Sequence, residues 1–158
     1  MDGLCEEGGD SLRRVFSIPG APVGKARPRV VVQGGHAHAY TPPKSASYAR
    51  LVAEVYKNSF PGQEPLTGAI TLVLRAYYPI PESWPQSKKA KALCGLIEPT
   101  VKVDFDNLAK IICDSLNGIA WVDDKQVVDA RITKIYSPIP RVEVEIHTRD
   151  TEGAYSPK

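Results

Sequence analysis

The chain has 158 residues, of which 42% are hydrophobic, and its formal net charge is +2 at pH 7. This length and hydrophobic content fit one domain with its own core. No apolar run approaches the roughly 18 residues of a membrane span, and the start lacks the regions of a signal peptide, so we expect a cytoplasmic protein with no membrane segment. Three scattered cysteines without C-x-x-C spacing predict neither a disulfide framework nor a zinc site.

The charge is unevenly distributed along the chain. The first ten residues hold four acids and no base, which leaves 20 basic against 14 acidic residues in the remainder. Residues 21–50 hold five Lys or Arg and no acid. A mildly basic body of this kind is compatible with nucleic acid as a partner, without establishing it.

The first half of the chain predicts a strand, a hairpin and a helix. Residues 1–12 are acidic and Gly-rich and are expected to form a disordered leader. Residues 14–18 form a strand candidate, and residues 30–33 and 37–41 can pair across Gly34-Gly35. Ser45 or Ser47 can cap a helix that runs to about Asn58.

The second half adds three strands and two helices. The apolar run 69–78 predicts an internal strand, and 87–93 predicts a short, very basic helix. Residues 126–136 and 142–147 alternate polar and apolar, as half-buried strands do, and we expect them to form an antiparallel pair. The pattern predicts an α+β fold with one mixed β-sheet flanked by helices over residues 13–148, followed by a flexible tail at 149–158.

The stretch 102–124, KVDFDNLAKIICDSLNGIAWVDD, is the most informative one. If its start is extended, Asp104 and Asp106 point to the same face. Asp106 is placed as the N-cap of the helix that follows, which Gly118 ends. The inward stripe of this helix consists of Leu108, Ile111, Ile112, Ser115 and Leu116. Asp123-Asp124 follow the turn and can return to the first acidic pair, with Trp121 packed beneath them.

Two interpretations of these acids remain open from spacing alone. In one, Asp106 only caps the helix and Asp123-Asp124 are ordinary turn residues. In the other, the acids hold one or two Mg²⁺ ions for phosphodiester hydrolysis, and Lys110, one turn after Asp106, stabilises charge on the phosphate. Asp104 favours the second interpretation, because it is an acid in an apolar approach with no capping role.

Two groups of basic residues could bind phosphates or could simply be solvated surface. The first group is Lys25, Arg27 and Arg29, and the second is Lys88, Lys89 and Lys91. His36 and His38 stand two apart in the predicted hairpin but have no third partner, so we do not predict a metal site there; they remain candidates for facing DNA.

The order of several motifs along the chain indicates the function more specifically than the spacing of the acids does. The run KVDFDNLAK…D…LNG…WVDDKQV closely resembles the signature of the RusA family of Holliday junction resolvases, and so do P-x-x-K-x-R-P-R (Pro22 to Arg29) and Tyr40-Thr41-Pro42. The likeness covers roughly residues 14–148. It implies a RusA-like fold and a homodimeric, Mg²⁺-dependent endonuclease, in which Mn²⁺ is expected to substitute for Mg²⁺. Such an enzyme nicks two opposing strands of four-way junction DNA in recombination and repair, and family members are often carried by phages and prophages.

The same resemblance assigns individual residues. By position, the catalytic acids and metal ligands of the family fall on Asp104, Asp106 and Asp124, and its catalytic lysine on Lys110. Asp114 and Asp123 match recurring acids with supporting roles. The basic groups at 25–29 and 88–91 would bind junction arms. The acidic leader and a Pro-rich, Lys-rich insert at residues 79–98 depart from the family pattern in length.

Two other functions stay in competition with junction resolution. One is a catalytically silent DNA-binding or replication-accessory protein that keeps the fold. The other is a metal-dependent nuclease for flaps or other branched DNA. The intact set of acids and lysine disfavours the silent protein, whereas only the substrate separates the two nucleases.

Overall fold

Strand β5 (Ile70–Pro79) lies inside the sheet and shows how the sequence builds it. Its residues alternate between buried and half-buried, so Ile70, Leu72 and Leu74 face a core while their neighbours face the other side. In the computed structural model, which describes residues 4–8 and 11–149, β5 pairs antiparallel with β7 (Arg141–Thr148) and parallel with β6 (Val127–Ser137). The sheet is therefore mixed, as predicted.

The sheet has five strands in the order β1-β2-β7-β5-β6. β2 (Ser11–Pro19) pairs with β7, and β1 (Leu4–Gly8) adds itself to the outer edge of β2. Leu4–Gly8 thus form a strand in the region where the sequence predicts a leader without structure. The predicted tail at 149–158 lies outside the described residues, except for Arg149, whose backbone N–H donates to Ala69 O at 2.9 Å.

The pairing of the last two strands differs from the prediction. β6 and β7 both alternate as expected, but they are not partners, because β5 lies between them. Two α-helices separate β5 from β6 in the chain. They form a crossover connection, so β6 runs parallel to β5. The alternation of polar and apolar residues indicates that a strand is half-buried, but it does not indicate which strand lies beside it.

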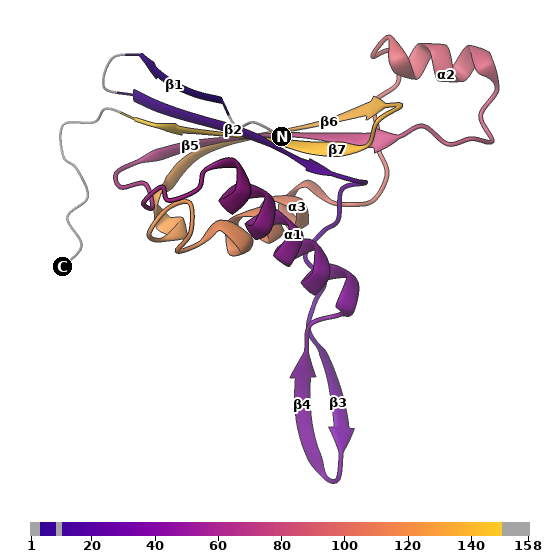
Figure 1. Ribbon diagram of the computed structural model, residues 1–158. Helices are drawn as coiled ribbons and strands as arrows, with labels where there is room; N and C mark the ends of the chain where they lie inside the picture. Colours follow the sequence, from indigo (N-terminus) through magenta and orange to yellow (C-terminus); the bar gives the residue numbers. More distant parts are fainter. Residues whose placement is uncertain (1–3, 9–10, 150–158) are drawn as a thin grey trace.

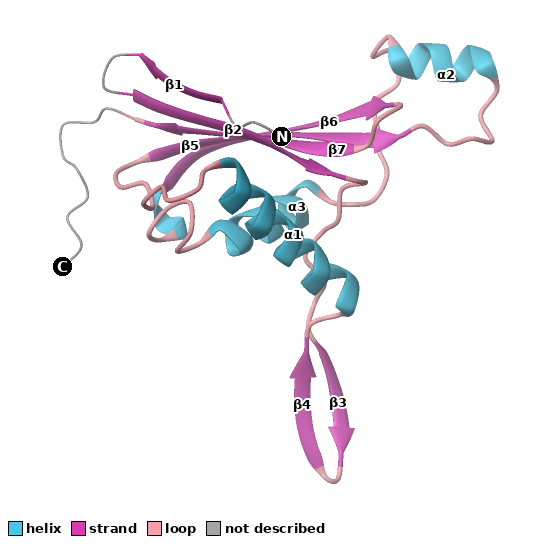
Figure 2. Cartoon of the chain, viewed as in Figure 1, coloured by secondary structure: helices cyan, strands magenta, loops and turns pink. Residues whose placement is uncertain are grey.

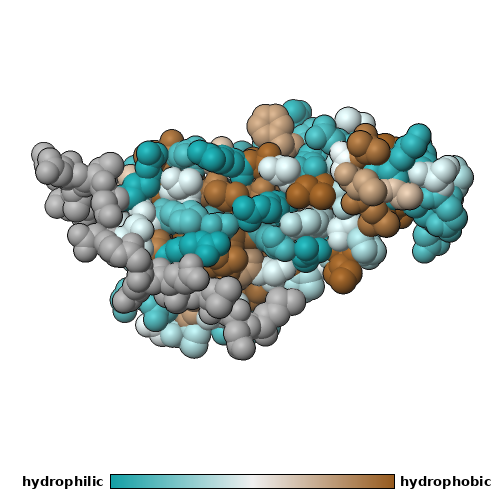
Figure 3. All heavy atoms as spheres, turned by 90° about the horizontal axis from the view of Figure 1, so that it is seen from above, coloured by the Kyte–Doolittle hydropathy of each residue, from teal (hydrophilic) through white to brown (hydrophobic). Residues whose placement is uncertain are grey.

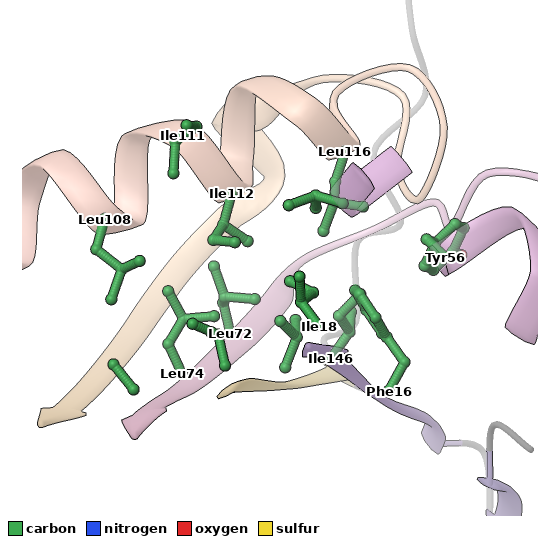
Figure 4. Packing of buried hydrophobic residues seen from close by; sticks show 14 of the residues in the cluster. Phe16, Ile18, Tyr56, Leu72, Leu74, Leu108, Ile111, Ile112, Leu116 and Ile146 are labelled. Carbon is green, nitrogen blue, oxygen red and sulfur yellow. The ribbon is translucent and has the colours of Figure 1, made fainter. Parts of the chain in front are cut away.

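Helices α1 (Pro43–Ser59) and α3 (Phe105–Leu116) cover one face of the sheet (Figures 1 and 2). The stripe predicted for α3 is buried in full and meets the side chains of β2, β5 and β7 in one core (Figure 4). α1 extends to the predicted end of its helix but begins earlier than predicted. Its N-cap position is Pro42, and Ser45 is a buried residue of the first turn.

A hairpin and two short helices complete the fold. The predicted hairpin forms as β3 (Arg29–Gln33) and β4 (His36–Tyr40), projects from the base of α1, and has all ten residues exposed (Figure 1). Helix α2 (Gln86–Leu93) lies beyond the end of the sheet where β5 and β6 end, on the side of the sheet away from the hairpin (Figure 1). The short 3₁₀ helix η1 (Asp124–Gln126) precedes β6. None of the described helices is long and apolar enough to cross a membrane.

Candidate active site at the start of α3

The helix that carries the predicted acids begins two residues earlier than predicted. Asp104, with an extended backbone (φ −66°, ψ 145°), occupies the N-cap position, and Asp106 lies in the first helical turn. The predictions that Asp106 is the N-cap and that residues 103–106 are extended are therefore wrong. Within the described chain, the Asp104 side chain makes no capping hydrogen bond, so both exposed carboxylates remain available at the positive end of the helix dipole.

The backbone that leads into Asp104 is fastened to the sheet. The buried Tyr78 hydroxyl donates to Val103 O at 3.2 Å and accepts from Val103 N at 3.3 Å. Lys134 Nζ on β6 donates to Val101 O at 2.5 Å. Burial raises the pKa of Tyr78, the hydrogen bond with Val103 lowers it, and the negative charge of Asp104 raises it further, which places that carboxylate close to the phenol.

The loop before the hairpin lies against the start of α3 and forms one wall of a cavity there. Lys25 N donates to Asn107 O at 2.9 Å, which seats the loop on the first turn of α3. A Cβ on Gly24 would lie 2.3 Å from Val103 Cγ1, so this close approach requires glycine. Between the loop and the helix lies an open cavity of about 280 Å³. Its lining residues are Gly24, Lys25, Lys102, Val103, Asp104 and Asn107.

Asp124 lies beyond α3, as the half-buried first residue of η1. Trp121 is fully buried beneath it, as predicted, and its Nε1 donates to Asp124 Oδ1 at 2.8 Å. Burial, together with the charges of Asp124 and Asp114, raises the pKa of Cys113 to about 12. Asp124 is therefore near Cys113, two turns after Asp106, and the Cys113 thiol stays protonated and is a poor nucleophile.

Gln126 fixes the loop that carries Asp124. Its buried side chain accepts from Val122 N and Asp123 N at 2.8 and 2.9 Å, and donates to Leu66 O and Gly68 O at 2.9 and 3.0 Å. Asp123 caps η1 in a capping box with Gln126, and its Oδ1 accepts from Lys125 N at 3.0 Å. Asp123 thus has a local structural role, which was one of the two interpretations of this pair.

The predicted residues are only partly brought together. Asp104, Asp106 and Lys110 are exposed in the N-terminal half of α3 and at its N-cap, whereas Asp124 lies on η1, after the helix. No group of three or more His, Cys, Asp or Glu side chains that could hold a metal ion occurs in the described part of the chain. Carboxylate oxygens nevertheless suit Mg²⁺, which commonly takes one or two protein carboxylates and completes its shell with waters and substrate phosphates. The exposed pair Asp104 and Asp106 fits that pattern.

The predicted basic residues fall in three places. Lys25 forms an ion pair with Asp114, with Nζ to Oδ2 at 3.1 Å, beside the candidate site. Arg27 and Arg29 line a second cavity at the base of the hairpin. The third group, Lys88, Lys89 and Lys91, is on α2, away from α3 (Figure 1). There Lys88 Nζ lies 3.9 Å from the centroid of the Trp84 ring.

Several residues of the site have weak or no sequence signals. Lys102 stands two residues before Asp104, and that proximity alone could have indicated it. Gly24 falls inside the P-x-x-K motif, where a glycine suggests a close approach. Tyr78 gives no local signal, because its partner Val103 is 25 residues away. Gln126 stands three residues after Asp123, the local spacing of a capping box, but its contacts with Leu66 and Gly68 have no local signal.

Comparisons with known proteins show the family of the chain. A family model described as Endodeoxyribonuclease RusA matches residues 19–147. A protein of Bacillus subtilis (strain 168), called "Uncharacterized protein YqaN", is 41% identical over 133 residues, covering 83% of this chain and 93% of its own length. The family match spans both the loop at Gly24 and the acids of α3.

Proposed function

Because the chain belongs to the RusA family of endodeoxyribonucleases, we propose that it resolves Holliday junctions in the cytoplasm by Mg²⁺-dependent, paired, symmetric nicks. The observation that carries this proposal is the start of α3. There the carboxylates of Asp104 and Asp106 are exposed, and Asp104 lines an open cavity together with Lys25 and Lys102. Such a site offers positive charge for a phosphodiester and carboxylates for a hard cation.

Each residue of the site has a role in this proposal. Asp104 and Asp106 would hold Mg²⁺, with Asp124 contributing from η1. A divalent ion held there would activate water for attack and neutralise charge on the leaving oxygen. Lys110, exposed one turn after Asp106, stabilises the charge that develops on the phosphate. Lys25 keeps Asp114 paired, and Asp123 caps the loop that presents Asp124.

A second copy of the chain is part of the proposal. Two sites related by a two-fold axis match the symmetry of a four-way junction, in which two opposing strands are cut. Lys25, Arg27 and Arg29 lie on the same side as the site and would hold the strand being cut. Lys88, Lys89 and Lys91, on α2 at the other side of the sheet, would contact a different junction arm.

The decisive experiment is nicking of a synthetic four-way junction with Mg²⁺, compared with a flap and with linear duplex. We expect the wild-type protein to cut the junction in opposing strands, and Asp106→Asn to lose at least a hundredfold in rate. Asp129→Asn, on β6, is the matched control and should cut normally. Equal cutting by wild type and Asp106→Asn, or no cutting by either, contradicts the nuclease. Preferential cutting of the flap favours the alternative nuclease for other branched DNA.

Metal binding is tested separately from cutting. Calorimetric titration with Mn²⁺ in the presence of uncleavable junction DNA should show binding to wild type. Asp104→Asn and Asp106→Asn should weaken it at least tenfold, because each removes a charged oxygen ligand. Equal Mn²⁺ affinity in all three proteins contradicts the assignment of these ligands.

A further inference from the structure

A second cavity, of about 460 Å³, lies at the base of the hairpin. Its charged lining residues are Arg27, Arg29 and Lys44. Among the described residues that line it, none is acidic or aromatic. The three cations have no acidic partner anywhere in the described chain, in contrast to Lys25 with Asp114. Their charge is therefore unneutralised by the protein itself.

The cavity has a fixed wall on the side of α1. Ser45 is buried, and its Oγ accepts from Ala26 N at 3.3 Å, which fastens the loop that carries Arg27 to the first turn of the helix. That first turn, all of it described, contains no acid and begins with Pro43. The positive end of a 17-residue helix thus adds to the charge of Lys44.

The two cavities adjoin each other. Gly24 lines both of them, so the loop from Gly24 to Arg29 leads directly from Asp104 to the hairpin base. The loop is anchored at two points, since Lys25 N donates to Asn107 O on α3 and Ala26 N donates to Ser45 on α1. The distance between the candidate active site and the second cavity is fixed by these anchors.

We propose that this second cavity is a subsite for a DNA backbone phosphate, on the strand whose scissile phosphate lies at Asp104 and Asp106. The inference rests on the proposed function and extends it, because it assigns a non-scissile phosphate to Arg27, Arg29 and Lys44. A pocket whose charged lining residues are all cations suits a phosphate, whose oxygens accept hydrogen bonds from Arg and Lys. A phosphate contact carries no sequence information and positions the strand for cutting.

The test uses junction binding in the Asp106→Asn background, so that it does not depend on cutting. The double substitution Arg29→Gln with Lys44→Gln should weaken binding roughly three- to tenfold and reduce the salt slope by about 1. The matched control, Arg50→Gln with Lys57→Gln, removes two exposed cations of α1 outside the cavity. It should bind as its parent does. Equal losses in both double variants overturn the proposal.

Replacing single phosphates of the junction by uncharged methylphosphonates locates the contact. At one position close to the cut site, the replacement should weaken binding by the parent several-fold and leave binding by the Arg29/Lys44 variant unchanged. If every position affects both proteins equally, the subsite does not exist. If inorganic phosphate alone binds the parent and not the variant, while both bind the junction equally, the cavity serves free phosphate and the proposal is wrong.

These outcomes are separate from those of the nuclease assay. A protein that binds junctions through the cavity but never cuts them contradicts the proposed catalysis and leaves the subsite in place. A protein that cuts, and whose Arg29/Lys44 variant binds and cuts normally, contradicts the subsite alone.

Discussion

Tyr78 connects the central part of the sheet with the candidate site. Its hydroxyl contacts both the N–H and the C=O of Val103, the residue before Asp104. The side chain is 4% exposed, so both backbone groups would lose their partner in a buried environment if the hydroxyl were removed. Tyr78 is thus a positioning residue for Asp104.

We predict that Tyr78→Phe lowers the free energy of unfolding by about 1–2 kcal/mol. We also expect the rate of junction nicking to fall roughly tenfold, because a small displacement of a ligand carboxylate is costly for catalysis. Urea unfolding and the nicking assay measure the two effects.

The neighbouring Tyr77 provides the control. Its hydroxyl donates to Glu143 Oε2 at 3.2 Å on the opposite face of the sheet. Tyr77→Phe should leave nicking unchanged. A Tyr78→Phe protein that is destabilised but nicks at the wild-type rate would show that the bond serves stability only.

The same residues show how far sequence could predict the site. Asp104, Asp106 and Lys110 were identifiable because their spacing is local. The residue at which the helix begins was not identifiable, since either Asp104 or Asp106 could stand at its N-cap. Tyr78 and Gln126 contact partners 25 and about 60 residues away, and no local pattern reports such contacts.

At the scale of elements, local signals were sufficient for the hairpin and for α3. Gly34 and Gly35 adopt φ of 61° and 81°, the left-handed conformation that the predicted two-residue turn requires. The apolar stripe of α3 follows its helical period. The position of β5 between β6 and β7, in contrast, depends on how the chain crosses over, which is a long-range property.

The hairpin has two different faces. Alternation places Val30, Val32, Ala37 and Ala39 on one face and Arg29, Val31, Gln33, His36, His38 and Tyr40 on the other. Val30 and Val32 are 65% and 70% exposed, so the apolar face contributes nothing to the described core.

We therefore predict that the fold tolerates removal of the hairpin. Deleting residues 30–33 and 36–39 connects Arg29 and Tyr40 through the existing Gly34-Gly35 turn. Arg29 and Tyr40 form the same kind of cross-strand pair as Gln33 and His36, because the pair type repeats every two residues. The melting temperature should change by less than about 2 °C, as expected when no buried contact is lost.

Calorimetry of the shortened and full-length proteins tests this. A substitution that does empty the core, Leu72→Ala, should lower the melting temperature by well over 5 °C under the same conditions. If the deletion is as damaging as Leu72→Ala, the hairpin supports the core.

For the whole molecule, the sheet has one face under the helices and a second face that carries charges. Hydrophilic and hydrophobic side chains are interspersed on this second face, seen from above in Figure 3. At its centre Glu145 of β7 accepts hydrogen bonds from both neighbouring strands. Arg13 Nε of β2 lies at 2.8 Å and Arg75 Nη1 of β5 at 3.1 Å, and His147 Nε2 lies 2.7 Å from the same carboxylate.

These contacts make the stability of the sheet dependent on pH. Burial by itself would raise the pKa of Glu145, but the hydrogen bonds from Arg13, Arg75 and His147 lower it to about 2. A free glutamate has a pKa of about 4.3, so the unfolded state takes up a proton at higher pH than the folded state. The stabilisation is fully present above about pH 5 and is lost as the pH falls towards 2.

We predict that Glu145→Gln is less stable than wild type at pH 7 and that the difference shrinks steadily between pH 5 and pH 2. The physical reason is that the wild-type protein loses its carboxylate contacts in that range, while the glutamine variant never had them. Chemical unfolding at a series of pH values measures the difference. Glu54→Gln, at an exposed position of α1, should follow the wild-type profile. A constant difference between Glu145→Gln and wild type over the whole range would mean that Glu145 stabilises the sheet by packing and not by its charge.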